Sequence, residues 1–323
     1  MMNMKLFHKF VLPVCLSLFS SGMALAADKI LVLMPDASGA HSALLGLEEE
    51  AAGDLELIKE YVTKKTSVSD IKAAFEKVKP SAVVLMNNPT VVKYRQYQES
   101  LGPDASFPPA IMMMASFLSQ TSEGVKNATG ISYEINGVTC FVNLRQIIDQ
   151  PVKRIGVLYH PRFEKFIGEQ RRLAALEEID LIPVRVKQKK LAKSVKKGLS
   201  RLLKDEEVDA LWVLNDNALL SKDVIVKSWL PALKRVEKPV VVSVSSLVST
   251  KFRFGSFAVL PDHTAMGVQA ANLLFELQDS DWEVGDRGIE EPLAVEKVIL
   301  LPFAKKYLNL KDKALSLIDR AIE

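Results

Sequence analysis

The sequence predicts an α/β protein built from two doubly wound parallel-sheet lobes. Short apolar or β-branched runs alternate with longer amphipathic runs along most of the chain, which is typical of repeated βα units. Nine strand-like runs are more than one open sheet usually holds. The polar stretch LSQTSEGVKNATGISY at 118–133 lacks helical periodicity, and the βα rhythm restarts at RIGVLYH. We therefore expect the chain to divide into two lobes near this stretch.

The first 26 residues predict a secretory signal peptide. Lys5 and Lys9 precede an apolar stretch, and Ala24-Leu25-Ala26 forms a small-x-small cleavage site. No later stretch approaches the roughly 20 apolar residues that a membrane-spanning helix needs. We therefore expect cleavage after Ala26 and a periplasmic protein.

The strands follow in order as apolar runs bounded by turn-forming residues. Lobe 1 is expected to hold strands at 29–34, 55–61, 82–86 and 110–114. Lobe 2 is expected to hold strands at 154–159, 182–186, 210–214, 240–244 and 255–259. A helix is predicted at 263–278 with Asp262 as its N-cap, because apolar residues recur there on one face: Met266, Ala270, Leu273, Leu274 and Leu277.

The segment 187–204 carries eight basic residues, with leucines and a valine at helical spacing. It can be interpreted as a solvated surface helix or as a site for an anionic partner or membrane surface. The acidic run at 205–207, which follows at once, favours the solvated helix.

Composition and missing motifs exclude several function classes. The chain has 42 basic and 39 acidic side chains, and two of the basic ones lie in the signal segment, so no basic excess indicates nucleic-acid binding. Cys140 is the only cysteine after residue 26, which leaves no intramolecular disulfide. Nucleotide-loop, hydrolase-elbow and common zinc motifs are absent, and the histidines are isolated in sequence. We therefore expect no catalytic residue, metal or cofactor.

Short polar side chains follow the predicted strands. In open parallel sheets, ligands bind beyond the carboxyl ends of the strands. The candidates at these strand ends are Asp36, Ser38, Asn87, Asn88, Ser116, His160, Asp216, Asn217 and Ser245. Asp262, the predicted N-cap of the helix at 263–278, is a further candidate. Any one of them could instead cap a helix. As a set they favour recognition of a small polar molecule over acid–base chemistry.

Asp216 stands out in this set. A buried carboxylate is costly unless it is paired, and a ligand ammonium would pair it. Met86 and Met112 near the strand ends are candidates to cover an apolar part of the ligand, or to belong to the core.

Several segments resemble the tryptophan/tyrosine-type family of ABC transporter substrate-binding proteins. KNATGISYEINGVTCFVNLRQIIDQPVKRIGVLYHP at 126–161 is similar to the junction between the lobes of that family. VDALWVLNDN at 208–217, SLV around Leu247, FGSFAVLPDHTAMGVQAA and the final RAIE, which is similar to a closing helix, follow in the family's order. Asp216 and Asn217 match the family's DN pair, and His41 matches a histidine of its first loop.

The resemblance implies a two-lobed periplasmic binding protein with three crossovers that form the hinge. Lobe 1 would comprise residues 28–117 and 262–291, and lobe 2 residues 118–261 and 292–323. A monomer would capture a small amphiphilic ligand, such as an amino acid, and present it to an inner-membrane permease. Departures in the loops PDASGAHSALLG and HPRFEKFIGEQ indicate a changed ligand or a role outside transport. A sensory binding module and, with His41 or His263 as base, a secreted enzyme on the same scaffold remain as alternatives.

Overall fold

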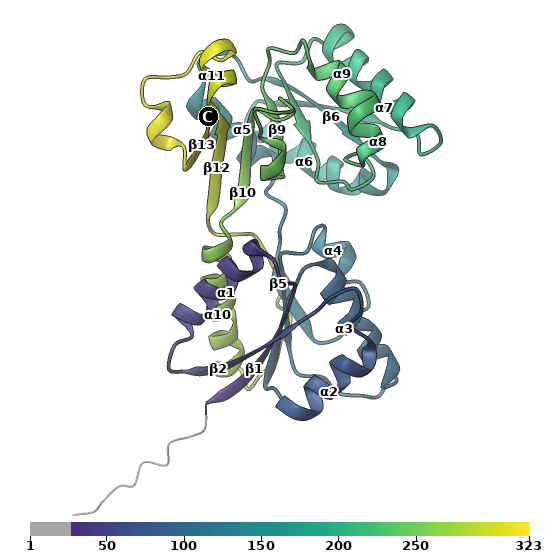
Figure 1. Ribbon diagram of the computed structural model, residues 1–323, viewed down its shortest axis with the longest axis vertical. Helices are drawn as coiled ribbons and strands as arrows, with labels where there is room; N and C mark the ends of the chain where they lie inside the picture. Colours follow the sequence, from purple (N-terminus) through teal and green to yellow (C-terminus); the bar gives the residue numbers. More distant parts are fainter. Residues whose placement is uncertain (1–26) are drawn as a thin grey trace, which may run out of the picture.

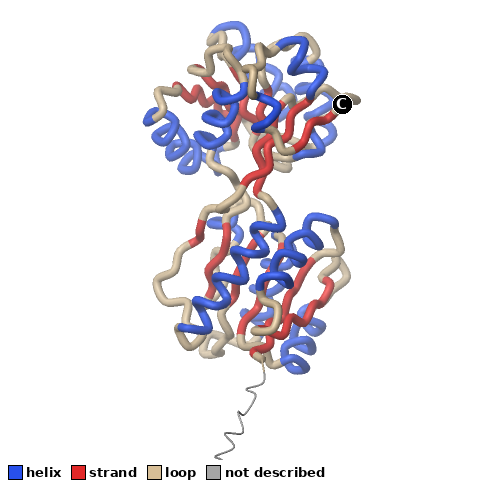
Figure 2. The backbone as a smooth tube through the Cα atoms, turned by 90° about the vertical axis from the view of Figure 1, so that its left-hand side faces the viewer, coloured by secondary structure: helices blue, strands red, loops and turns tan. Residues whose placement is uncertain are grey.

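The computed structural model describes residues 27–323. The predicted signal peptide and its cleavage site after Ala26 lie outside the described residues. Within 27–323, no helix is both long and apolar enough to span a membrane. Two α/β lobes, joined at a narrow waist, make up this part of the chain, which confirms the predicted fold class (Figures 1 and 2).

Lobe 1 is built on a parallel sheet. Its strand order is β2 (Leu55–Tyr61), β1 (Asp28–Met34), β3 (Ala82–Met86), β4 (Ala110–Met113), β5 (Ala128–Ile131) and β11 (Ile289–Glu290). One face is covered by α1 (Ser38–Glu50) and α10 (His263–Asp279), and the other by α2 (Val68–Val78) and α3 (Asn88–Ser100), with short α4 (Leu118–Thr121) beside α3 (Figure 1). Each face has its own buried apolar cluster.

Close packing of α1 against α10 places the N-termini of both helices side by side. A Cβ at Gly267 would lie 1.9 Å from the Ala43 carbonyl oxygen, and one at Gly46 would lie 2.0 Å from the Thr264 carbonyl oxygen. Only glycine permits this approach. The two glycines therefore fix the position of His263 relative to the first turn of α1.

The first five strands of lobe 2 repeat the order of the first five strands of lobe 1, and two further strands, β12 and β13, follow where lobe 1 has β11 alone. The order is β7 (Asp180–Arg185), β6 (Arg154–Tyr159), β8 (Ala210–Val213), β9 (Val240–Val242), β10 (Phe257–Pro261), β12 (Val295–Leu300) and β13 (Arg320–Ile322). Only the β10–β12 pair is antiparallel.

The helices of lobe 2 enclose one large apolar cluster. They are α5 (Gly137–Ile147), α6 (Glu164–Leu176), α7 (Leu191–Ser200), α8 (Lys222–Val224), α9 (Leu230–Leu233) and α11 (Leu301–Tyr307). A π-helical turn, Arg201–Asp205, continues α7, and another, Ile225–Trp229, joins α8 to α9. Short 3₁₀ turns lie at Pro161–Phe163, Ser245–Leu247 and Ala314–Leu317.

Three chain segments cross between the lobes. They run from β5 to α5, from β10 to α10 and from β11 to β12. Strands β10 and β12 lie side by side and reach from lobe 2 down to the waist (Figure 1). The hinge therefore consists of three short connections.

The first crossover lies later than the sequence indicated. Residues 128–131 form β5 of the lobe 1 sheet, so the expected boundary at 117/118 is wrong. This strand, ATGI, is short and contains Gly130, where a Cβ would lie 2.2 Å from the Met112 carbonyl oxygen. No apolar run in the sequence indicates this strand. The closing RAIE is also not helical, because 320–322 pair with β12 as an edge strand.

The nine predicted strands are all present, and some of their ends shift. Strand β7 begins and ends earlier than the expected 182–186, and β10 lies two residues beyond the expected 255–259. Strand β9 stops at Val242, two residues before the expected end, and a 3₁₀ turn at Ser245–Leu247 follows. The helix predicted at 263–278 is confirmed, with Asp262 as its N-cap.

Candidate ligand-binding cleft

A cavity of about 500 Å³ lies between the two lobes. The N-terminal turns of α1 and α10 form its lobe 1 side. Its lobe 2 side is formed by the residues after β8 and β9, the last residues of β10 and the first residues of β12 and β13, together with the first connection. Its lining consists of Ser38, Gly39, Ser42, Tyr133, Asn215, Ser243, Val244, Ser245, Leu260, Pro261, His263, Glu296 and Arg320. The lining is therefore dominated by hydroxyl groups and other short polar side chains.

The N-terminus of α1 forms the lobe 1 side of the cavity. Ala37 at the N-cap position is extended and offers no side-chain acceptor. The first N–H groups of a helix have no intrahelical partner, and they carry the positive end of the helix dipole. Together with the Ser38 and Ser42 side chains, they make this end of the cavity a hydrogen-bond donor surface.

Tyr133 and His263 form one wall of the cavity. The Tyr133 hydroxyl lies 3.1 Å from His263 Nε2, and the two rings stack at 5.8 Å with an interplanar angle of 14°. Burial lowers the pKa of His263, and burial raises the pKa of Tyr133. Both groups are therefore neutral at pH 7, and they act as hydrogen-bonding groups without net charge.

Glu296 and Arg320 are the charged residues of the lining. The Arg320 guanidinium donates two hydrogen bonds to the Glu296 carboxylate, at 2.7 and 3.2 Å. This two-pronged pair offsets most of each charge. The cavity as a whole therefore carries little net charge.

Asp216 does not face the cavity with a free carboxylate, which corrects its predicted role. It accepts hydrogen bonds from His160 Nδ1 at 2.5 Å, from Arg162 Nη2 at 2.6 Å and from the Ala218 backbone N–H at 3.0 Å. Its side chain is fully buried. The protein supplies its own cation at the place where a ligand ammonium was expected.

Ser116 and Asn88 hold structure at the edge of the cleft. The Asn88 side chain accepts from the Ser116 N–H and donates to the Ser116 carbonyl and to the Thr121 hydroxyl. The Ser116 hydroxyl accepts a 3.0 Å hydrogen bond from Asn215 Nδ2, across the lobes. Beside it, the Phe117 ring lies 4.2 Å from the Phe163 ring. The lobes therefore touch directly on this side.

The other predicted residues have local roles or face solvent. Asn87 caps α3 through Thr90, and Asp262 caps α10 and lines a smaller cavity beside the main one. Asp36 and His41 form an exposed pair at 2.8 Å. Asn217 is exposed. Of the predicted set, Ser38 and Ser245 therefore line the main cavity, while Met86 and Met112 are buried in the lobe 1 cores.

Sequence reasoning missed several lining residues. Tyr133 lies in a connection that no periodicity marks, and Glu296 and Arg320 come from the last two strands, whose pairing was not foreseen. Asn215 and His263 could have been included, because one follows a predicted strand and the other begins a predicted helix.

Comparison with protein-family models gives no match, and no curated protein matches the chain. The structure is similar to a ligand-free, open substrate-binding protein with adhesive properties from Clostridium difficile, with a TM-score of 0.66, 13% identity, and coverage of 91% of this chain and 99% of that one. It is also similar to an ABC domain in complex with L-Trp from Streptococcus pneumoniae (TM-score 0.56, 17% identity, coverage 91% and 100%).

A third similar structure is a periplasmic ribose ABC transporter protein from Conexibacter woesei (TM-score 0.51, 14% identity, coverage 88% and 96%). At these identities the likeness concerns the fold. The chain has the two-lobed periplasmic binding-protein fold, in agreement with its three crossovers and its repeated strand order.

Proposed function

We propose that this protein is a periplasmic solute-binding protein that captures a small polar ligand between its lobes and delivers it to an ABC permease. The observation that carries the proposal is the cavity between the lobes, which is lined by the N-terminal turns of α1 and α10 on one side and by the ends of lobe 2 strands on the other. The likeness in fold to substrate-binding proteins supports it. The cavity has the volume of a small-metabolite site, and we propose binding without chemical conversion by a monomer.

The lining suggests which groups the ligand carries. The donors at the α1 N-terminus and the hydroxyls of Ser243 and Ser245 suit an acidic or hydroxylated end. Leu260, Pro261 and the Tyr133 ring suit an apolar part. If the ligand is an amino acid, its ammonium would share the Glu296 carboxylate with Arg320, because Glu296 lines the cavity whereas Asp216 does not.

Binding is coupled to closure of the lobes in this proposal. A ligand that contacts both lobes stabilises the closed arrangement in proportion to the contacts it gains there. Three short connections limit the motion to a hinge rotation. The permease would then recognise the closed protein.

A thermal-shift screen of residues 27–323 against amino acids, hydroxy acids and sugars tests the proposal. A true ligand raises the Tm by mass action. For that ligand, Ser243→Ala/Ser245→Ala should weaken binding about tenfold or more, since two hydrogen bonds are lost. Ser246→Ala is the matched control, because Ser246 is exposed and adjacent but does not line the cavity. Equal binding by both variants would place the ligand elsewhere.

Delivery to a permease needs a second assay. The liganded protein should stimulate ATP hydrolysis by its transporter in proteoliposomes, and the unliganded protein should not. Binding without stimulation of any transporter encoded beside it would contradict the import role while leaving the binding role intact.

A further inference from the structure

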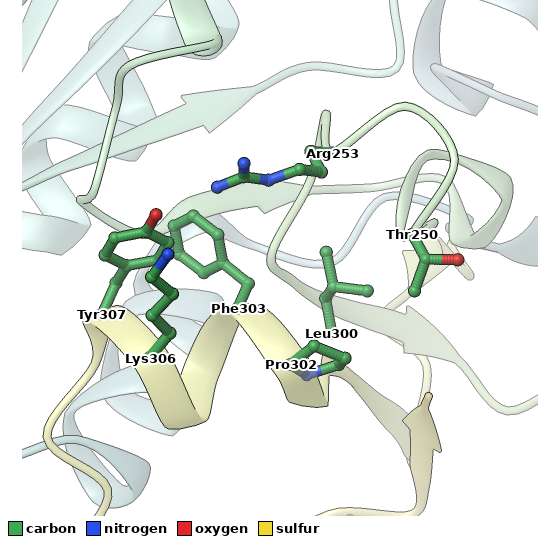
Figure 3. A pocket seen from close by; sticks show the side chains of 7 residues that line it. All are labelled: Thr250, Arg253, Leu300, Pro302, Phe303, Lys306 and Tyr307. Atoms are coloured by element: carbon green, nitrogen blue, oxygen red, sulfur yellow. The ribbon is translucent and has the colours of Figure 1, made fainter.

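A second cavity, of about 190 Å³, lies in lobe 2 between α11 and the loop that precedes β10. Because β12 is antiparallel to β10, its last residue, Leu300, lies at the end of the sheet opposite to Pro261 and the cleft. Figure 3 shows Phe303, Lys306 and Tyr307 projecting from α11, with Arg253 over the two rings and with Leu300 and Thr250 beside them. This cavity is therefore separate from the proposed ligand cleft.

Two cations in this cavity have no acidic partner. The Arg253 guanidinium lies 6.0 Å from the centre of the Phe303 ring and 5.7 Å from that of Tyr307, and Lys306 Nζ lies 5.0 Å from the Tyr307 ring centre. Among the ion pairs of residues 27–323, none within 4.0 Å involves Arg253 or Lys306. By contrast, Arg145, Arg154, Arg201 and Arg320 each bind a carboxylate.

Arg253 has an unusual backbone conformation. Its φ of +46° lies in the left-handed region, which a residue with a side chain rarely adopts, and its N–H donates to the Ser249 carbonyl at 3.0 Å. Such conformations persist where surrounding structure enforces them, often at ligand sites. One of the two cations of the cavity therefore comes from a residue with a backbone conformation of this kind.

The Tyr307 phenol reports the same positive field. The Lys306 ammonium and the Arg253 guanidinium lower the pKa of Tyr307, because the cations stabilise the phenolate. A ligand carboxylate would meet the same stabilisation. Leu300, Phe303 and Pro302 give the cavity an apolar floor, which a bare inorganic anion would not use.

We propose that this cavity binds a small organic carboxylate with a planar apolar body, of about the size of benzoate. The carboxylate would accept hydrogen bonds from Arg253 and Lys306, and the body would lie on the apolar floor beside Phe303. The site would act independently of the cleft.

Isothermal titration calorimetry of residues 27–323 with sodium benzoate tests this site. We expect binding in the millimolar range or tighter, no binding of benzyl alcohol, and weaker binding of inorganic phosphate. Arg253→Ala/Lys306→Ala should weaken benzoate binding about tenfold or more. Lys305→Ala/Lys313→Ala is the matched control, because it removes the same charge from exposed lysines outside the cavity.

A spectroscopic titration gives a second readout. The phenolate absorbance of the wild type minus that of Tyr307→Phe reports the pKa of Tyr307. Benzoate should raise this pKa, because its carboxylate offsets the two cations, and Ser243→Ala/Ser245→Ala should leave the effect unchanged. Three results would each overturn the proposal: no benzoate binding at 10 mM, equal benzoate binding by Arg253→Ala/Lys306→Ala and Lys305→Ala/Lys313→Ala, or phosphate binding as tight as that of benzoate.

Discussion

The two lobes share a strand order but treat the polar ends of their strands differently. In lobe 1, Asp36 and His41, which follow β1, are exposed and pair with each other, which leaves the N-terminus of α1 open to the cavity. In lobe 2, the charged residue after β8, Asp216, is buried and paired within its own lobe. In both arrangements the carboxylate is paired within the protein and is not free to bind a ligand. A polar strand end therefore becomes a binding group only where the fold leaves it unpaired.

The buried network of lobe 2 should be the more sensitive of the two. Asp216→Ala removes the partner of the buried His160 and of the Arg162 guanidinium, and it should lower the free energy of unfolding by about 3–4 kcal/mol. Asp36→Ala, at the exposed pair of lobe 1, should change it by less than about 0.5 kcal/mol. Urea denaturation of both variants measures the difference. Similar small losses would show that Asp216 does not hold lobe 2 together.

The connection between the lobes should respond to pH. Burial raises the pKa of Glu134 to about 7, while its carboxylate accepts a hydrogen bond from the Phe117 N–H in lobe 1. A carboxyl whose folded-state pKa exceeds its unfolded value of about 4.5 favours the folded protein at low pH, and that contribution is lost as the pH rises from about 4.5 through 7. The loss should amount to roughly 3 kcal/mol.

Glu134→Gln should flatten this part of the dependence of stability on pH, since glutamine does not titrate and keeps an acceptor for Phe117. Chemical denaturation between pH 4.5 and 8 measures it, with exposed Glu123→Gln as the control. An unchanged slope in Glu134→Gln would mean that Glu134 titrates normally.

The close contact of α1 with α10 in lobe 1 can be tested by substituting Gly267, with a helical glycine of lobe 2, Gly168, as the control. Gly267→Ala would drive a Cβ into the Ala43 carbonyl, and it should destabilise the protein by about 2 kcal/mol and weaken ligand binding, because His263 moves away from α1. Gly168 lies in α6 with open space around its Cβ position, so Gly168→Ala should be neutral or stabilise by up to about 1 kcal/mol. Thermal unfolding distinguishes the two. Equal effects would contradict the close helix contact.

The smallest effect should come from the hydrogen bond between the lobes. Asn215→Ala removes the donor to the Ser116 hydroxyl and should weaken contact between the lobes by about 1 kcal/mol. Small-angle scattering of the unliganded protein should show a larger radius of gyration than in the wild type. Asn217→Ala, two residues on and exposed, is the control. A radius that is the same in all three proteins would show that this bond does not hold the lobes together.

The fold could be predicted from the sequence because its signal is local. Each buried parallel strand is a short apolar run, and the amphipathic helix 263–278 has a capping residue just before it. Two strands were not predicted, because their positions depend on residues far away in the sequence. Strand β5 packs Gly130 against the Met112 carbonyl, and β13 pairs with β12. No local pattern encodes such pairings.

The site was harder to predict for the same physical reason. Sequence places Asp216 at a strand end correctly, but whether its carboxylate is free depends on Arg162, which lies 54 positions earlier. Ser38 and Ser245 line the cavity, whereas Asn87 and Asn88 bond within lobe 1. A sequence shows which side chains can form hydrogen bonds. Whether such a side chain bonds a ligand or another residue depends on its neighbours in the folded protein.

Native mass spectrometry of the protein, purified from its source cells without denaturation, tests whether the cavity between the lobes holds a small molecule. We predict that the wild type and Ser246→Trp carry a bound small molecule, and that Ser245→Trp, whose side chain would fill the cavity between the lobes, does not. A bound mass that persists in Ser245→Trp, or a wild type without any bound mass that also shows no thermal shift with any compound of the screen, would contradict it.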